Sequence, residues 1–186
     1  DGLAAEYSLG DTSFLGRALE VKLPPDARTV TIAYRTGPEA SALQWLAPQQ
    51  TAGKQHPFLF TQGQAILTRT WIPIQDSPGI RFTYEARVKA PQGLMAVMSA
   101  ENPTTVSADG SYTFKMEQPI PAYLIALAVG DLAFLPIGAR TGVYAEPGMV
   151  EKAAWEFADM ERMLESAEKL YGAYRWGRYD VIVLPP

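Results

Sequence analysis

The sequence contains no cysteine, and only one of its 186 residues is a histidine. Without cysteine the chain can form neither a disulfide framework nor a thiolate metal site, so cysteine content does not indicate its redox compartment. A protein zinc site needs about three protein ligands, and no second nitrogen or sulfur ligand lies near His56 in GKQHPFLF. We therefore interpret His56 as a loop residue before Pro57 and predict no metal ligand in this chain.

Long apolar runs and clusters of basic residues are also missing. The apolar stretch PAYLIALAVG, residues 121–130, is about half the roughly 20 residues that a membrane-spanning helix requires. The net charge is −4, and Lys and Arg are scattered along the chain. Nucleic acids and anionic membranes are bound by clustered basic residues, so we predict neither as a partner. We find no targeting segment in these residues, and the localisation is left open.

Catalytic motifs that can be found by spacing alone are absent as well. The sequence has no Ser-centred nucleophile elbow, no Gly-rich phosphate loop and no HExxH. What the sequence does have is an ordinary globular composition, with 47% hydrophobic residues, in a chain long enough to bury a core. Composition and spacing therefore predict a fold but no reaction.

Short alternating or β-branched runs recur through residues 1–142. They include RALEVKL, RTVTIAYRT, IRFTYEARVKA and SYTFKME, and clusters of Pro, Gly, Asp and Ser separate them. This spacing predicts a mainly β domain with antiparallel sheets, a sandwich or a curved sheet. The pair Asp109-Gly110 predicts a hairpin turn, because a type I′ turn needs positive φ at both central residues. Trp45 and Tyr123 lie in apolar runs and are predicted to be core residues.

The period of the apolar residues changes from two to 3.6 after Pro147. This change predicts one helix over about residues 147–171, with Gly172 placed to end it. The run YDVIVLPP then predicts a buried strand over about residues 179–184. We place a domain boundary after residue 142, so that residues 143–186 begin a second domain. A buried strand needs neighbours to cover it, and we expect the chain to be part of a longer protein.

Three separated blocks of sequence carry a resemblance to a known family. They are SALQWLAPQQTAGKQHPFLFTQGQAILTRTWIPIQDSPGIRFTYEARVKAP, PIPAYLIALAVGDL and WGRYDVIVLPP. In this order they resemble the amino-terminal half of the M1 family of zinc aminopeptidases, in the branch that contains leukotriene A4 hydrolase and aminopeptidase B. The resemblance runs from about Leu19 to Pro186.

The resemblance implies a division of the chain and an activity for the intact protein. Residues 1–142 would be the later part of a saddle-like β domain, with earlier strands missing before Asp1. Residues 143–186 would begin a thermolysin-like catalytic domain. The intact protein would be a zinc hydrolase that removes amino-terminal residues from peptides, with its HExxH helix beyond Pro186. The chain by itself is then expected to bind no zinc and to be inactive, and its partners would be peptide substrates and the catalytic domain of the same polypeptide.

The segment FTQGQAILTR, residues 60–69, holds the predicted site residues. On a strand, Gln62 and Gln64 would share one face, while Gly63 on the other face would let another backbone come close. The resemblance implies that Gln64 reaches into the catalytic cleft and helps to hold the α-amine of the substrate. It places Gln62 beside that amine and Ala65 in the pocket floor, and it puts no catalytic residue in the chain. The epoxide hydrolase activity of one member of the branch is not carried over.

A non-enzymatic β-sandwich that binds a carbohydrate or a protein is the alternative function. Such a module would present a row of exposed aromatic side chains on one sheet face. In this sequence the aromatic residues are instead distributed among apolar runs.

Overall fold

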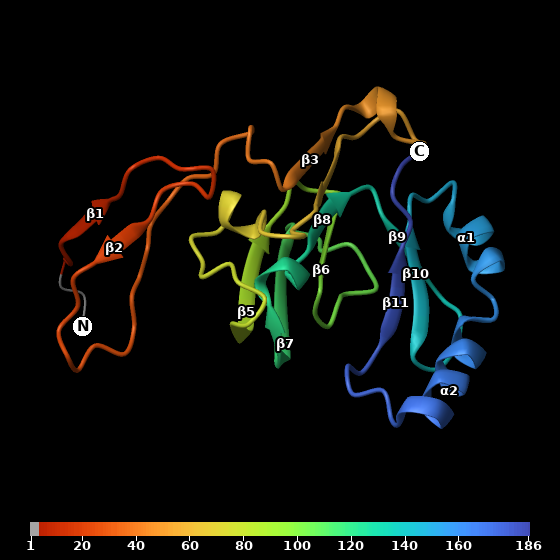
Figure 1. The fold of residues 1–186 in the computed structure, drawn as a ribbon. Coiled ribbons are helices and arrows are strands. Elements are labelled where there is room, and N and C mark those ends of the chain that lie inside the picture. Colours follow the sequence, from red (N-terminus) through yellow and green to blue (C-terminus); the bar gives the residue numbers. More distant parts are fainter. Residues whose placement is uncertain (1–3) are drawn as a thin grey trace. The chain divides into compact units, whose positions relative to one another are not determined.

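The computed structural model of the chain describes residues 4–186, and it confirms the predicted mainly β fold with antiparallel sheets. The strands are β1 (Tyr7–Leu9), β2 (Leu19–Val21), β3 (Leu43–Leu46), β4 (Phe58–Thr61), β5 (Arg81–Lys89), β6 (Met95–Met98), β7 (Ser111–Pro121), β8 (Leu127–Gly130), β9 (Ala133–Pro136), β10 (Thr141–Ala145) and β11 (Tyr179–Ile182) (Figure 1). The helices are α1 (Val150–Glu156) and α2 (Met160–Tyr171), with short 3-10 helices η1 (Pro48–Gln50), η2 (Thr68–Thr70) and η3 (Ala122–Leu124).

The chain divides into two compact units, at residue 35. The first unit is built on the antiparallel pair β1–β2, in which Tyr7 lies opposite Val21 and Leu9 lies opposite Leu19. These apolar positions share one face of the pair because alternate residues of a strand point the same way. The predicted site residues all belong to the second unit, residues 36–186.

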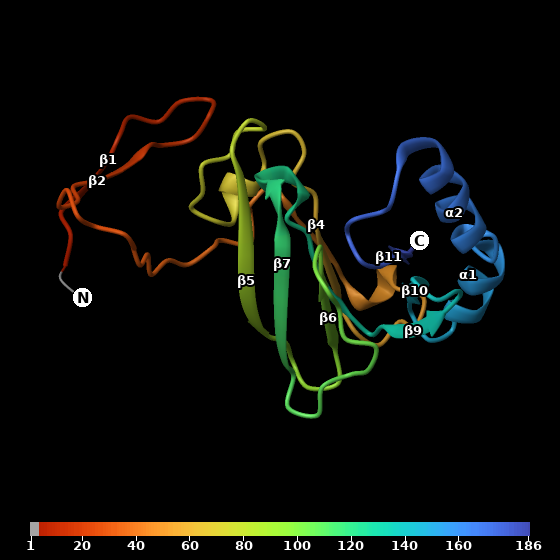
Figure 2. The same cartoon turned by 90° about the horizontal axis from the view of Figure 1, so that it is seen from below.

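Two sheets of the second unit enclose its main core. One is the four-stranded antiparallel sheet β3-β4-β8-β6, and the other is the antiparallel pair β5-β7 (Figure 2). Exposed and half-buried residues alternate along all of β5, as they do when one strand face packs on a core and the other faces water. The inward side chains of both sheets meet in one cluster, which includes Phe58, Met95, Phe114 and Ala128. A sandwich-like arrangement therefore holds β4, the strand that precedes the predicted site.

A third sheet carries the two helices. Its strand order is β11-β10-β9, with β10 antiparallel to β9 and parallel to β11. A parallel pair needs a long crossover connection, which α1 and α2 provide, and both helices lie on one side of this sheet (Figure 1). Val150 and Ala153 of α1 pack against Val143 and Ala145 of β10. Because β9 pairs with β10, this sheet spans residue 142, and the domain boundary placed there stays a prediction.

The prediction of one helix over residues 147–171 is wrong, since the chain turns between α1 and α2. The amide of Met160 donates to the carbonyl of Phe157 at 2.9 Å. This bond spans three residues, as in a 3-10 helix, whereas an α-helical bond spans four. Asp159 lies at the N-cap position of α2, where its carboxylate accepts the guanidinium of Arg162 at 3.0 Å and no helix amide. The apolar period does not reveal this turn, because buried residues lie on both sides of it. Gly172, with φ of 91°, ends α2 as predicted.

The predicted hairpin turn at Asp109-Gly110 is also wrong. Strands β5 and β7 pair with each other, but residues 90–110 join them and include β6. Gly110 does have a positive φ of 76°. Asp109 instead accepts the amide of Ser111 at 3.0 Å and the hydroxyl of Ser107 at 2.8 Å, which is a local turn at the start of β7.

Trp45 was predicted to be a core residue and is 55% exposed. It lies on β3, an edge strand of the four-stranded sheet, and its neighbour Leu46 packs on the core instead. Successive residues of a strand point to opposite faces, so an apolar run on an edge strand leaves one of two neighbours in water. Tyr123, predicted with it, is half-buried.

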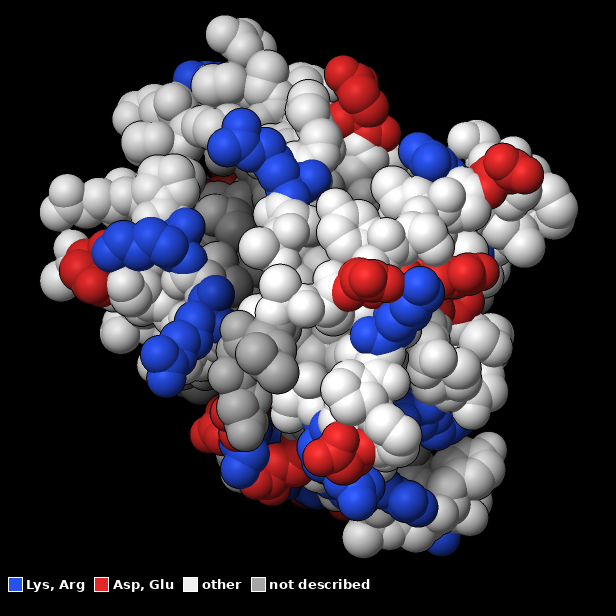
Figure 3. All heavy atoms as spheres, turned by 90° about the vertical axis from the view of Figure 1, so that its left-hand side faces the viewer, with Lys and Arg blue, Asp and Glu red and all other residues white. Residues whose placement is uncertain are grey.

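No helix within residues 4–186 is long and apolar enough to cross a membrane. Figure 3 shows one face of the molecule, on which acidic and basic side chains are interspersed.

Candidate substrate-amine site

The predicted site residues lie in a turn and not on a strand. Strand β4 ends at Thr61, where its pairing with β3 ends, and η2 begins at Thr68. Gln62, Gln64 and Ala65 lie between these two elements, and all three residues are exposed. The strand alternation that would give Gln62 and Gln64 a common face therefore does not apply to them. We call residues 62–67 the amide turn.

Gly63 is the buried residue of the amide turn, and the backbone of Tyr123 lies against it. A Cβ atom at position 63 would lie 2.8 Å from the carbonyl oxygen of Tyr123 and 2.7 Å from Oγ1 of Thr68. Both distances are shorter than a carbon atom tolerates. The prediction that a glycine at this position lets another backbone come close is therefore confirmed.

Backbone hydrogen bonds fix the shape of the amide turn. The amide of Gln62 donates to the carbonyl of Ala42 at 2.8 Å, next to the end of β4. The amide of Leu67 donates to the carbonyl of Gly63 at 2.8 Å and closes the turn. The hydroxyl of Thr70 in η2 donates to the carbonyl of Leu67 at 2.7 Å and accepts the amide of Ala42 at 3.1 Å. Both ends of the turn are thus tied to the segment before β3.

The two glutamine side chains of the turn have different surroundings. Oε1 of Gln62 accepts the backbone amide of Gln64 at 3.0 Å. The side chain of Gln64 makes no hydrogen bond with any residue that the structure describes. Its amide offers one oxygen acceptor and two N–H donors. Of the two glutamines, Gln64 is therefore the one whose side-chain oxygen accepts no hydrogen bond from a described residue.

The amide turn carries no charge of its own, because residues 61–68 include no acidic or basic side chain. Within residues 4–186 no group of three or more His, Cys, Asp or Glu could hold a metal ion. His56 lies exposed in the loop between η1 and β4, as predicted for a loop histidine. The chemistry that the turn offers is therefore hydrogen bonding by a neutral amide.

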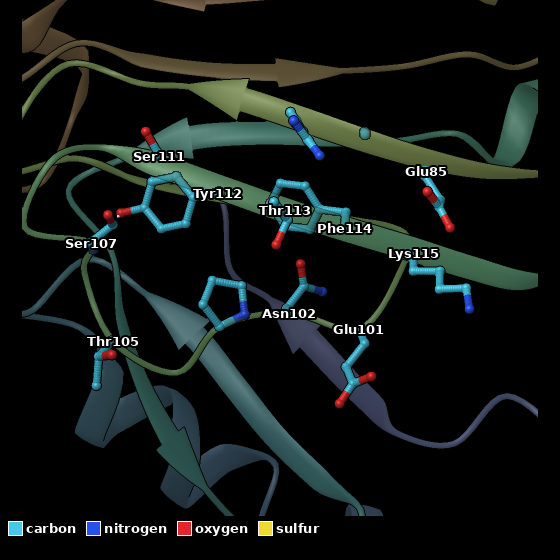
Figure 4. Close-up of a pocket in the computed structure, with 13 residues that line it drawn as sticks. Glu85, Glu101, Asn102, Thr105, Ser107, Ser111, Tyr112, Thr113, Phe114 and Lys115 are labelled. Atoms are coloured by element: carbon cyan, nitrogen blue, oxygen red, sulfur yellow. Dashed lines mark hydrogen bonds between the residues drawn. The ribbon is translucent and has the colours of Figure 1, made fainter.

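A separate hollow lies between the pair β5–β7 and the loop after β6. Its volume is about 900 Å³, and its charged lining residues are Glu85, Arg87, Glu101 and Lys115 (Figure 4). None of the predicted site residues lines this hollow. Two acidic and two basic side chains line it, and we assign it no function.

Comparison with known proteins identifies the family. The family model of the Peptidase M1 N-terminal domain, which describes the sequences of that family, matches residues 16–124, more than half of the chain. The chain therefore contains a peptidase M1 N-terminal domain. The chain belongs to the peptidase M1 family, and the resemblance found in its sequence is confirmed.

The relatives are longer proteins of the predicted branch. The chain is 45% identical to leukotriene A-4 hydrolase of Xenopus laevis, and the match covers 100% of this chain and 32% of that protein. It is 44% identical to human aminopeptidase B, and that match covers 94% of this chain and 27% of that protein. The chain therefore spans less than a third of the length of these relatives.

The fold is shared with solved structures of the same branch. Native leukotriene A4 hydrolase from Saccharomyces cerevisiae superposes with a TM-score of 0.86 at 34% identity, over 100% of this chain and 29% of that chain. A second structure, yeast LTA4 hydrolase in complex with Bestatin, gives a TM-score of 0.85 at 34% identity, over 98% of this chain and 29% of that chain. A role for Gln62, Gln64 or Ala65 in binding a substrate stays a prediction.

Proposed function

We propose that the chain is part of a zinc-dependent aminopeptidase, and that its amide turn helps to hold the free α-amine of a peptide substrate. Membership of the M1 family and the aminopeptidases among the relatives support this activity. The observation that carries the proposed site is the side chain of Gln64. It is exposed, free of hydrogen bonds to the described residues, and carried by a turn that several hydrogen bonds fix.

An acceptor for the amine is a chemical requirement of this reaction. An aminopeptidase cleaves only the first peptide bond, so it has to hold the free α-amine at a fixed distance from the reacting carbonyl. A charged amine that leaves water must find acceptors, and the amide oxygen of Gln64 is such an acceptor. A carboxylate binds an ammonium group more strongly than a neutral amide does. Gln64 would therefore act beside an acidic residue that lies elsewhere in the intact protein.

The neighbours of Gln64 have smaller roles in this proposal. Gln62 would lie next to the bound amine, and the methyl side chain of Ala65 would leave room for the first side chain of the substrate. The zinc ligands would lie in the part of the protein that this chain does not span. Zinc bound there would lower the pKa of its water to about 7 and would polarise the carbonyl that is attacked.

The test is the activity of a Gln64→Ala variant of the intact protein. A hydrogen bond to a charged group contributes about 1.5–3 kcal/mol, which corresponds to a fall in kcat/KM of roughly 10- to 150-fold. The matched control is Gln55→Ala, because Gln55 is also exposed but lies in the loop before β4. Wild-type kinetics in Gln64→Ala would remove Gln64 from the site. An equal loss in the control would show that the effect is not specific to the amide turn.

A further inference from the structure

We propose that Thr68 is a positioning residue that sets the place of Gln64 in the amine site. This inference rests on the proposed function. Thr68 is 0% exposed, and its hydroxyl donates to the carbonyl of Ala122 in η3 at 2.9 Å. It follows the amide turn directly and lies four residues after Gln64. The bond joins segments that are 54 residues apart in the sequence.

The same 3-10 helix supports the amide turn at a second point. Gly63 packs on the backbone of Tyr123, which follows Ala122 in η3. Thr68 also lies next to Gly63, because its Oγ1 would be 2.7 Å from a Cβ atom at position 63. The start and the end of the turn therefore rest on one support, and Gln64 is on the exposed stretch between them.

This support is joined to the sheet from which the turn emerges. Helix η3 leads into β8, and β8 pairs with β4, with Leu59 opposite Val129. The amide turn begins at the end of β4. The bond from Thr68 to Ala122 thus closes a ring of contacts that runs through β4, the turn, η3 and β8. A ring of this kind fixes the position of its members more tightly than a free loop would.

Thr68 is a stronger determinant of the position of Gln64 than Gln62 is. The side chain of Gln62 also contacts the turn, since it accepts the amide of Gln64. Gln62 is exposed, however, so a water molecule can replace its amide oxygen. No water replaces a hydroxyl that is fully buried without space being made for it. Loss of the Thr68 hydroxyl leaves the carbonyl of Ala122 with the amide of Ile125 and removes the direct hydrogen bond between the end of the turn and η3.

The consequence for catalysis is a loss of alignment. A hydrogen bond to the substrate amine requires a donor-acceptor distance of about 2.7–3.2 Å, and a displacement of about 1 Å can lower a rate by as much as 100-fold. Thr68 acts through Gln64 and touches no substrate in this proposal. Its removal should therefore matter only for ligands that carry the amine.

The experiment uses three substitutions at position 68 in the intact protein. Thr68→Val keeps the shape and removes the hydroxyl, Thr68→Ser keeps the hydroxyl, and Thr68→Cys offers a weaker donor. We expect kcat/KM for a peptide substrate to fall in the order Ser, Cys, Val, with a loss of about 5- to 100-fold for Val. Two zinc-binding hydroxamates, one with and one without an α-amine, serve as probes. Thr68→Val should weaken the binding of the amine-bearing hydroxamate and leave the binding of the other hydroxamate unchanged.

A double variant tests whether Thr68 acts through Gln64. In a Gln64→Ala background, Thr68→Val should cost less than about 2-fold further in kcat/KM, because the group that it positions is already absent. Additive losses, equal weakening of both hydroxamates, or wild-type kinetics in Thr68→Val would overturn the inference. If the valine variant does not fold, the cysteine variant decides by the same criteria. A silent Gln64→Ala variant would instead refute the proposed function itself, and the inference with it.

Discussion

Glu146 joins two segments that are 93 and 94 residues apart in the sequence. Its buried carboxylate accepts the backbone amides of Ala52 at 2.7 Å and of Gly53 at 2.9 Å. Its own carbonyl accepts the amides of Met149 and Val150 at the start of α1. Glu146 therefore ties the loop between η1 and β4 to the first helix.

The expected effect of Glu146→Ala follows from the two lost bonds. A hydrogen bond to a charged group contributes about 1.5–3 kcal/mol, so two of them set an upper limit of about 6 kcal/mol. Ala52 and Gly53 are exposed residues, and water can satisfy their amides once the carboxylate is gone. We therefore expect local opening of the loop to become easier by about 2–3 kcal/mol, or roughly 30- to 150-fold.

Hydrogen exchange of the amides of Ala52 and Gly53 measures this opening directly. Glu146→Ala should raise their exchange rates by the stated factor and leave β6 protected. Glu146→Gln keeps one acceptor oxygen and should have a smaller effect. The control is Glu151→Ala, because Glu151 is an exposed glutamate in the first turn of α1. Unchanged exchange at both amides, or equal acceleration in β6, would refute this role for Glu146.

Two further predictions concern stability. Arg140 donates to both carboxylate oxygens of Glu168, at 2.8 and 2.9 Å, and together with the amide of Tyr174 it lowers the pKa of Glu168 to about 2. Because the pKa of Glu168 lies below its usual value near 4.5, its ionised carboxylate stabilises the fold above about pH 5, and this contribution is lost as the pH falls toward 2. The difference between the thermal midpoints of wild type and Glu168→Gln should therefore shrink between pH 7 and pH 3. A difference that stays constant over this range would contradict the role of the ion pair. Gly110→Ala should lower the free energy of unfolding by more than about 1 kcal/mol in urea titrations, because φ is 76° and the new methyl group would meet the carbonyl of Ala90. Gly79→Ala, with open space around it, is the control, and an equal effect in both variants would contradict that reasoning.

Patterns in the sequence predict the elements whose faces are decided by burial. Exposed and half-buried residues alternate along the whole of β5, and the period of two in IRFTYEARVKA is enough to identify this strand. The turn between α1 and α2 is different, because Met160 and Leu164 continue the apolar stripe that Val150 and Ala153 begin. A backbone hydrogen bond from Met160 to Phe157 marks this turn, and a side-chain period does not record such a bond.

Some features of the candidate site could be predicted from the sequence, and others could not. The family resemblance selects Gln64 and its neighbours, and Gly63 is correctly expected to admit another backbone. Strand alternation misplaces the two glutamines, because pairing with β3 ends at Thr61. The bond from Thr68 to Ala122 connects residues 54 positions apart, and a lone threonine in the sequence gives no signal of it.

The central claim is that Gln64 holds the amine of the substrate, and a crystal structure of the intact protein with an amine-bearing aminopeptidase inhibitor tests it most directly. We predict that the amide oxygen of Gln64 lies about 2.7–3.2 Å from the nitrogen of that amine. A Gln64 side chain that points into solvent, with the amine held only by other residues, would contradict the claim.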